Sequence, residues 1–298
     1  MYRTGGRVAL GAALLLAAMC AWSAPLTVLL TNDDGYDAPG LAALRTALLA
    51  AGHRVTVVAP LHQQSGSGVR LTLGELAVQA EGEGAWAVDG SPADAVAVGL
   101  TRLLPARPDL VMSGANLGQN LGANVVSSGT VGAAVMAVQF GVPAIAVSVG
   151  LDLTEARATP TPFPSTTAAY PLAASTVVRL VERLAAAARG GPLLPPDTLL
   201  NVNVPARPAD ALAGVALVPL GAHGGFRFDY PPVAEGRVRA ALDVDLAGAR
   251  DANSDTGRFA VGWITLSVLR PGWAAEGARA ADVAARLGDV AGLAPTAP

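Results

Sequence analysis

The sequence predicts an α/β protein built on a doubly wound, mostly parallel β-sheet. Short apolar runs typical of buried strands alternate with helical segments between residues 26 and 148. This alternation favours parallel strands joined by right-handed crossovers. The 298 residues are 52% hydrophobic and 14% charged, which suits one large globular domain, or one with an appended subdomain.

Periodicity and end signals define the individual elements. Leu41 and Leu44 share one face of a helix, and Ser91 stands where a helix cap is expected. The segments over 151–167 and 206–257 lack periodicity and are rich in turn-forming residues. The expected elements are strands over 26–30, 54–59, 69–78, 86–88, 109–112, 143–149, 199–204 and 259–269, and helices over 39–51, 92–104, 128–140, 168–189 and 276–287.

Residues 1–23 have the pattern of a secretory signal peptide. Two arginines precede an apolar run over 8–21, and small residues allow cleavage after Ser23. The alternative is an uncleaved anchor, but the run is shorter than the ~20 residues of a membrane span. Cleavage would remove two arginines, changing the net charge from −3 to −5, and also Cys20, the only cysteine. We therefore expect an exported, periplasmic protein with no disulfide and no stable membrane span.

The rest of the chain divides into two expected parts. Residues 24–205 are expected to form the core. Residues 206–298 are expected to form an irregular or β-rich extension that ends in a strand and a helix and is either part of the same domain or an oligomerisation arm. The negative net charge argues against a nucleic-acid groove. All 20 basic residues are arginine, which excludes Schiff-base lysine chemistry and a Walker P-loop.

Two adjacent aspartates, Asp33 and Asp34, follow directly on the first strand. The carboxyl ends of parallel strands are where α/β proteins bind ligands. Two like charges about 4 Å apart repel by roughly 4 kcal/mol at an effective dielectric near 20. Either one carboxyl group holds a proton or a cation lies between the two. The alternative interpretation is a solvated loop that caps the next helix.

Polar loops follow two further strands and are expected on the same edge of the sheet. These are residues 62–66, which include His62 and Ser65, and residues 113–116, which include Asn116. With the two aspartates they offer only oxygen donors, a set that selects Mg²⁺, Mn²⁺ or Ca²⁺ rather than zinc.

The next segment suggests an anion site. Residues 118–124 are rich in glycine and asparagine, and Ser128, Gly129 and Thr130 begin a helix whose free N–H groups suit a phosphate. Ordinary helix capping is the alternative explanation for Ser128 and Thr130. A metal beside an anion site predicts metal-assisted phosphoester hydrolysis.

At this point the chain resembles the SurE survival-protein nucleotidases. The order and spacing of the matching motifs run from about 26 to 270. The motifs are Leu29-Leu30-Thr31-Asn32-Asp33-Asp34-Gly35-Tyr36, Val57-Val58-Ala59-Pro60, Gln64-Ser65-Gly66, Val88-Asp89-Gly90-Ser91-Pro92-Ala93-Asp94, Ser113-Gly114-Ala115-Asn116-Leu117-Gly118, Ser128-Gly129-Thr130-Val131-Gly132-Ala133-Ala134, Asn201-Val202-Asn203-Val204-Pro205 and Gly262-Trp263-Ile264-Thr265.

The resemblance implies a metal-dependent phosphatase acting on nucleoside 5′- or 3′-monophosphates. It implies a Rossmann-like core with a β-rich extension, and a homodimer or homotetramer formed through carboxyl-terminal elements. One divalent cation per subunit, Mg²⁺ or Mn²⁺ with Ca²⁺ possible in crystals, would be held by Asp33, Asp34, Ser65 and Asn116. The residues expected to border the phosphate or the substrate are Asn120, Ser128, Gly129, Thr130, Gly90, Ser91 and His62.

Several positions depart from the family's pattern. Leu61-His62-Gln63 replaces a run that usually contains charges, and Ser127 stands where tyrosine is common. Asn124 replaces a usual acid, and Ala95 a usual cysteine. These changes leave the predicted metal ligands intact and bear on substrate preference and subunit contacts.

The three histidines have different expected roles. His53 follows a helix end and is interpreted as structural. His62, on the predicted active edge, and His223, in a glycine-rich stretch, are candidates for substrate contact or general acid catalysis.

Two other functions remain open from the sequence. An exported solute-binding protein would explain the leader and the sheet without catalysis. A phosphatase with an aspartyl-phosphate intermediate usually has Asp-x-Asp and a lysine, and this chain has neither in that position. The favoured mechanism is that Asp33 and Asp34 hold a cation, while one of them or another group takes a proton from the attacking water.

Overall fold

The computed structural model describes residues 24–152, 154–155, 163–244 and 251–272, together with 281 and 285–286. The predicted leader over 1–23, and nearly all of the predicted helix over 276–287, lie outside the described residues. None of the helices in the described ranges is both long and apolar enough to span a membrane.

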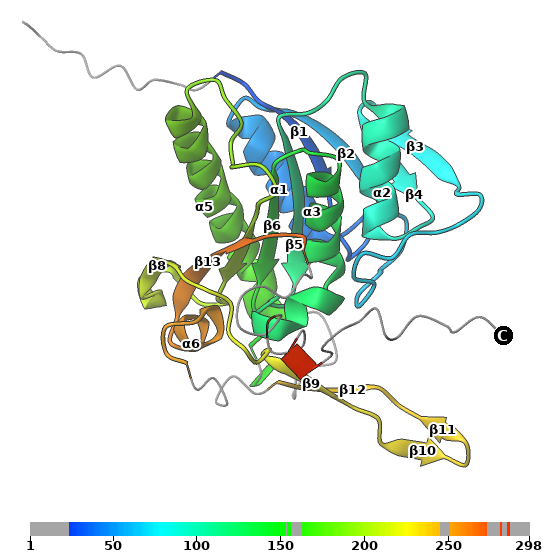
Figure 1. The fold of residues 1–298 in the computed structure, drawn as a ribbon, viewed down its shortest axis with the longest axis vertical. Helices are drawn as coiled ribbons and strands as arrows, with labels where there is room; N and C mark the ends of the chain where they lie inside the picture. Colours follow the sequence, from blue (N-terminus) through cyan, green and yellow to red (C-terminus); the bar gives the residue numbers. More distant parts are fainter. Residues whose placement is uncertain are drawn as a thin grey trace, which may run out of the picture.

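A nine-stranded sheet forms the centre of the molecule, in the order β3-β4-β2-β1-β5-β6-β7-β13-β8 (Figure 1). The strands from β4 to β7 run parallel, β3 is antiparallel to β4, and β13 is antiparallel to β7. The prediction of a mostly parallel sheet is therefore confirmed. The strands are β1 (Thr27–Thr31), β2 (Arg54–Pro60), β3 (Val78–Gly82), β4 (Ala85–Val88), β5 (Leu110–Leu117), β6 (Ala144–Val149), β7 (Leu199–Val204), β8 (Gly214–Leu217) and β13 (Trp263–Leu269).

Helices cover both faces of the sheet, as a doubly wound fold requires (Figure 1). Helices α1 (Pro39–Ala50) and α5 (Pro164–Ala188) pack against each other and against one face. Helices α2 (Pro92–Val98) and α3 (Gly129–Gln139) pack on the other face. A π-helical segment, η1 (Gly99–Leu103), continues α2, and the 3₁₀ helix η2 (Gly122–Ser127) precedes α3.

Several predicted element boundaries were wrong. The strand expected over 69–78 begins only at Val78, because Thr72 donates its N–H and hydroxyl to the Asp94 carboxylate instead of joining a ladder. The strand expected from 259 begins at Trp263, because Ser254 caps a short helix, α6 (Asp255–Ala260). Helix α5 begins at Pro164, since proline fits the first helical turn.

The irregular stretch after β7 contains a β-rich extension. Strand β9 (Phe226–Asp229) pairs with β12 (Ala241–Val244), and β10 (Pro232–Ala234) pairs with β11 (Arg237–Val238). These pairs form an arm that projects from the core (Figure 1). A one-turn 3₁₀ helix, η3 (Ala209–Ala211), precedes β8, and β8 and β13 then complete the central sheet.

Candidate active site

The two aspartates lie at the carboxyl end of β1, where the chain turns away from the sheet. Gly35 has a φ of +105°, a conformation that favours glycine, and the Asn32 side-chain N–H donates to its carbonyl at 2.8 Å. The turn leaves Asp33 only 3% exposed and Asp34 partly buried.

Asp33 lies at the amino terminus of α3. The Thr130 hydroxyl donates to Asp33 Oδ1 at 2.5 Å, and the backbone N–H groups of Thr130 and Gly129 also favour the charged carboxylate. Burial outweighs these donors and raises the pKa of Asp33 above its ordinary value. The helix terminus predicted to bind an anion thus holds the Asp33 carboxylate in this structure.

Asp34 points toward β5, where the Leu117 backbone N–H donates to its Oδ2 at 2.8 Å. Burial, and then the charge of Asp33, raise the pKa of Asp34 to about 7. The buried Tyr170 of α5 lies near enough for the Asp34 charge to add to the effect of burial in raising the tyrosine pKa. Among the residues that the structure describes, no cationic side chain acts on either aspartate, so the charges of this carboxyl pair are not balanced there.

Asn116 belongs to β5 rather than to a loop, which corrects the prediction that the strand ends at 112. Strand β5 continues to Leu117 with an irregularity between Ser113 and Asn116, where Gly114 has a φ of +137°. The Asn116 side-chain N–H donates to the Gly118 carbonyl at 2.6 Å. Since the amide nitrogen is engaged in this way, the Asn116 oxygen is the atom available to a ligand.

The loop after β2 approaches the aspartates through its backbone. The Gln64 N–H donates to the Asp33 carbonyl at 2.7 Å, and the Gly68 N–H donates to the Ser127 carbonyl at 3.1 Å. Ser65 lies between these two anchors and is exposed. The loop therefore carries Ser65 along the same edge as Asp33.

The donor set fits a hard divalent cation. Within the described residues, Asp34 Oδ1 and Asn116 Oδ1 accept no hydrogen bond, and Asp33 Oδ2 has no side-chain partner. These residues also contain no cluster of three His, Cys, Asp or Glu side chains able to hold a metal. The predicted ligands combine two carboxylates with a hydroxyl and an amide, an oxygen set that suits Mg²⁺ or Mn²⁺.

Ser67 is a site residue that sequence reasoning missed. Its buried hydroxyl has no hydrogen-bond partner, and it lies 2.7 Å from the position that a Cβ on Gly129 would occupy. Asp33 Oδ2 lies 2.9 Å from the same position, so the Ser67 hydroxyl and the Asp33 carboxylate both lie against Gly129 at the start of α3. The repeated Ser-Gly pattern of residues 65–68 was the available signal.

Several predicted substrate residues have structural hydrogen bonds. The Ser128 hydroxyl caps α3 by accepting from the Val131 N–H at 3.1 Å. Ser91 caps α2 in a reciprocal capping box with Asp94, and its side chain is fully buried. Gly90 packs against Asp94, where a Cβ would come within 2.9 Å of the carboxylate.

Asn120 is 7% exposed, and its side chain forms hydrogen bonds to buried hydroxyl groups near the candidate site. Its side-chain N–H groups donate to Thr130 Oγ1 at 3.3 Å and to Ser148 Oγ at 2.9 Å. Asn120 is therefore connected to Asp33 through Thr130.

The three histidines occupy different environments. His53 is 5% exposed, its Nδ1 accepts from the Leu26 N–H at 3.2 Å, and burial lowers its pKa. His62 is exposed, and its backbone lies against Gly35. His223 is also exposed, and its carbonyl packs against Gly122 near the Asn120 loop.

Asp255 fixes the position of the His223 segment. Its carboxylate accepts from the Gly221 N–H at 2.7 Å and from the Gly122 N–H at 2.8 Å. Asn124 adds a second connection, since its amide pairs with the N–H and carbonyl of Phe226 at 3.0 and 3.3 Å. The base of the β-rich arm is thereby attached to η2, next to the loop that carries Asn120.

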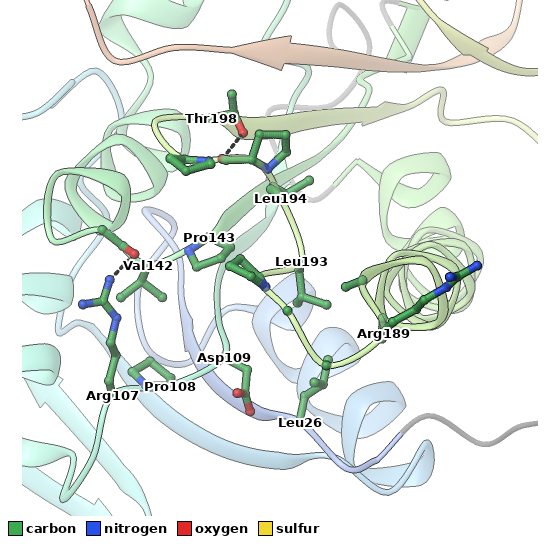
Figure 2. Close-up of a pocket in the computed structure, with 18 of the residues that line it drawn as sticks. Leu26, Arg107, Pro108, Asp109, Val142, Pro143, Arg189, Leu193, Leu194 and Thr198 are labelled. Carbon is green, nitrogen blue, oxygen red and sulfur yellow. Dashed lines mark hydrogen bonds between the residues drawn. The ribbon is translucent and has the colours of Figure 1, made fainter.

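A cavity of about 920 Å³ lies at the opposite, amino-terminal edge of the sheet (Figure 2). Two of its polar side chains already have partners: Asp109 accepts from the Thr27 N–H and hydroxyl at 2.7 Å each, and Arg107 donates to the Gly141 carbonyl. Ligands of α/β sheets bind at the carboxyl edge, so this cavity is not the candidate site.

The chain is similar to several known proteins in sequence and in fold. Residues 28–224 match the family described as survival protein SurE. The chain is 45% identical over 186 residues to the 5′-nucleotidase SurE of Pelobacter propionicus, covering 62% of this chain and 68% of that protein. It is 42% identical over 251 residues to the 5′-nucleotidase SurE 1 of Burkholderia lata, covering 82% and 90%. The crystal structure of the SurE protein from Aquifex aeolicus superposes with a TM-score of 0.67 at 30% identity, covering 83% of this chain and 94% of that one. The chain therefore belongs to the SurE family.

Proposed function

We propose that this chain is a divalent-metal-dependent phosphomonoesterase that hydrolyses nucleoside 5′-monophosphates, and also 3′-monophosphates, to nucleoside and phosphate. The observation that carries the proposal is the convergence of Asp33, Asp34 and Asn116 at one sheet edge, each with an oxygen left for a ligand. The proteins named 5′-nucleotidase SurE that this chain resembles support the same activity.

In each aspartate, one carboxylate oxygen accepts a hydrogen bond from the protein and the other is left for a ligand. Asp33 Oδ1 is bonded to Thr130, and Asp34 Oδ2 to the Leu117 N–H, so Asp33 Oδ2 and Asp34 Oδ1 are available to the cation or to a proton from water. When bound, the cation would polarise a phosphate oxygen and lower the pKa of a water molecule. Ser65 and Asn116 would complete the oxygen ligands.

The substrate phosphate would lie beside the amino terminus of α3. The Gly129 and Thr130 N–H groups face Asp33, and positive helix ends favour anions. The exposed His62 lies on the same edge and is available to the nucleoside or to the leaving oxygen. The buried turn at Gly90 and Ser91 would support this side of the site through the cap of α2.

Phosphate release from AMP tests the proposal. We expect turnover with Mn²⁺ or Mg²⁺, loss of activity with EDTA, and a decrease of at least 100-fold in kcat/KM for Asp33→Asn, about 3 kcal/mol of transition-state stabilisation. Activity of Asp33→Asn within a few-fold of the parent would contradict the assigned role. Binding of nucleotide without turnover would instead indicate a solute-binding protein.

We also propose that the protein is exported to the periplasm with residues 1–23 removed, and that it assembles as a homodimer or homotetramer. The leader pattern and the family resemblance support these two proposals. Amino-terminal sequencing of the periplasmic fraction tests the first, with Ala24 as the expected first residue. Light scattering of the purified protein tests the second, and a monomeric mass would contradict it.

A further inference from the structure

A buried network of hydrogen bonds connects strand β7 to the candidate metal ligand Asp33. Its members are Asn203, Asn120, Thr130 and Asp33, which are between 0% and 7% exposed. Asn203 is neither a predicted metal ligand nor a predicted substrate contact. Three hydrogen-bond steps, which pass through Asn120 and Thr130, nevertheless join it to the Asp33 carboxylate.

The Asn203 side chain forms hydrogen bonds to both the N–H and the carbonyl of Asn120. Its Oδ1 accepts from the Asn120 N–H at 2.7 Å, and its Nδ2 donates to the Asn120 carbonyl at 3.0 Å. Asn201, two residues earlier on the same face of β7, donates to that carbonyl at 2.9 Å. Residue 120 lies between β5 and η2 and is in neither, so these side chains supply the bonds that a neighbouring strand would otherwise provide.

The direction of each hydrogen bond in the rest of the network follows from its members. An ionised carboxylate only accepts, so the Thr130 hydroxyl must donate to Asp33 Oδ1. The Thr130 oxygen then accepts from Asn120 Nδ2, and the second N–H of that amide goes to Ser148 Oγ. Both N–H groups of the Asn120 side chain are therefore engaged.

This arrangement leaves one free hydrogen-bonding atom on Asn120. Within the described residues, its Oδ1 accepts no hydrogen bond, while its main-chain groups and Nδ2 are all paired. Asn120 can therefore offer the site an acceptor for an O–H group, and it has no spare donor for a phosphate oxygen.

We propose that Asn203 is a positioning residue of the active site, which acts on Asp33 through the Asn120 main chain and the Thr130 hydroxyl. The inference rests on the proposed function only in taking Asp33 as a ligand of the divalent cation. Without Asn203, the loop carrying Asn120 loses two of its three main-chain bonds to β7, and the Asn120 amide can leave Thr130. The Asp33 carboxylate then loses the fixed orientation that cation binding uses.

Asn203→Ala tests the proposal, with Ser267→Ala as a matched control. Ser267 is 1% exposed on the neighbouring strand β13, opposite Asn201, and its hydroxyl donates to the Val218 carbonyl at 2.8 Å. Both variants lose buried hydrogen bonds from adjacent strands, but the bond of Ser267 does not lead to Asp33. Asn201→Ala, which removes one bond to the Asn120 carbonyl, gives an intermediate perturbation.

The readouts are the Mn²⁺ dissociation constant from the spin-resonance signal of free Mn²⁺, the Tm, and kcat and KM for AMP. We expect Asn203→Ala to weaken Mn²⁺ binding about 10-fold, or about 1.4 kcal/mol. We expect Asn201→Ala to weaken it two- to five-fold, and Ser267→Ala to stay within two-fold of the parent. The kcat for AMP should fall in the same order.

Equal Mn²⁺ affinity in Asn203→Ala and Ser267→Ala would overturn the proposal, whatever their Tm values. If Asn203→Ala does not fold, Asn201→Ala against Ser267→Ala decides by the same measurement. A parent protein that binds Mn²⁺ but does not hydrolyse AMP would contradict the proposed function alone, and the affinities would still test Asn203. A parent that binds no Mn²⁺ would overturn the inference as well.

Discussion

The affinity of the site for a divalent cation should depend strongly on pH, because the cation has to displace protons from the buried aspartates. Asp34 has a pKa of about 7, raised first by burial and then by the charge of Asp33. If Asp34 alone titrates, about 3% of it is ionised at pH 5.5 and about 90% at pH 8. Mn²⁺ affinity should therefore increase about 30-fold between these two pH values, and further if Asp33, whose pKa is also raised, releases a proton.

Titration of Mn²⁺ at pH 5.5, 6.5, 7.5 and 8, at constant ionic strength, measures this dependence directly. Calorimetry in two buffers of different ionisation enthalpy would count the protons released. Asp34→Asn should bind Mn²⁺ more weakly and show a much flatter pH profile. Asp37→Asn, a change at an exposed position in the same loop, is the control and should keep the parent profile. A parent affinity that changes by less than about three-fold from pH 5.5 to 8 would refute the reasoning.

The same pKa shift has a consequence for stability. A carboxyl group whose pKa is raised in the folded state holds its proton more tightly there than in the unfolded chain, so its contribution favours folding at low pH. That contribution is lost as the pH rises from about 4 to about 7, and for Asp34 it amounts to about 4 kcal/mol at most. Saturating Mn²⁺ should restore stability above pH 7. A metal-free protein whose free energy of unfolding is the same at pH 5 and pH 8 would contradict the assignment.

Three further predictions concern other residues. Ser91→Ala should lower the free energy of unfolding by about 1–2 kcal/mol through loss of the α2 cap, while Mn²⁺ affinity stays within two-fold; urea denaturation and Mn²⁺ titration check both parts. Burial lowers the pKa of His53, so its contribution to stability is complete above its unfolded pKa of about 6.5 and is lost as the pH falls from that value through the lower pKa of the folded state. His53→Gln should therefore flatten the decrease in stability between pH 7.5 and 5.5, and an unchanged slope would exclude this role. Gly129→Ala should weaken Mn²⁺ binding at least 10-fold, because the added Cβ would lie 2.7 Å from Ser67 Oγ and 2.9 Å from Asp33 Oδ2. Alanine is otherwise the better helix residue, so unchanged affinity with a higher Tm would show that the site tolerates the methyl group.

Local sequence signals predicted most of the core because local physics decides those elements. An apolar run such as Val55 to Val58 is stable in an α/β protein as a buried strand of the sheet. The capping box of Ser91 and Asp94 is likewise complete within four residues. Two of the errors fell where distant partners decide: Thr72, inside the strand expected over 69–78, bonds to Asp94, and residues 255–260 form a helix whose first residue binds Gly122 and Gly221.

The sequence by itself determined the fold class, the oxygen-rich character of the site and the family, because these depend on residue types and on their order along the chain. Tertiary structure alone decided which atoms of the site remain free. Thr130 and the start of α3 hold one side of Asp33, the Leu117 N–H holds one oxygen of Asp34, and the Gly118 carbonyl holds the Asn116 amide. Asn203 reaches the same site from more than 80 residues away in sequence. Hydrogen-bond direction and burial depend on which neighbours the fold brings together, and spacing along the chain does not contain that information.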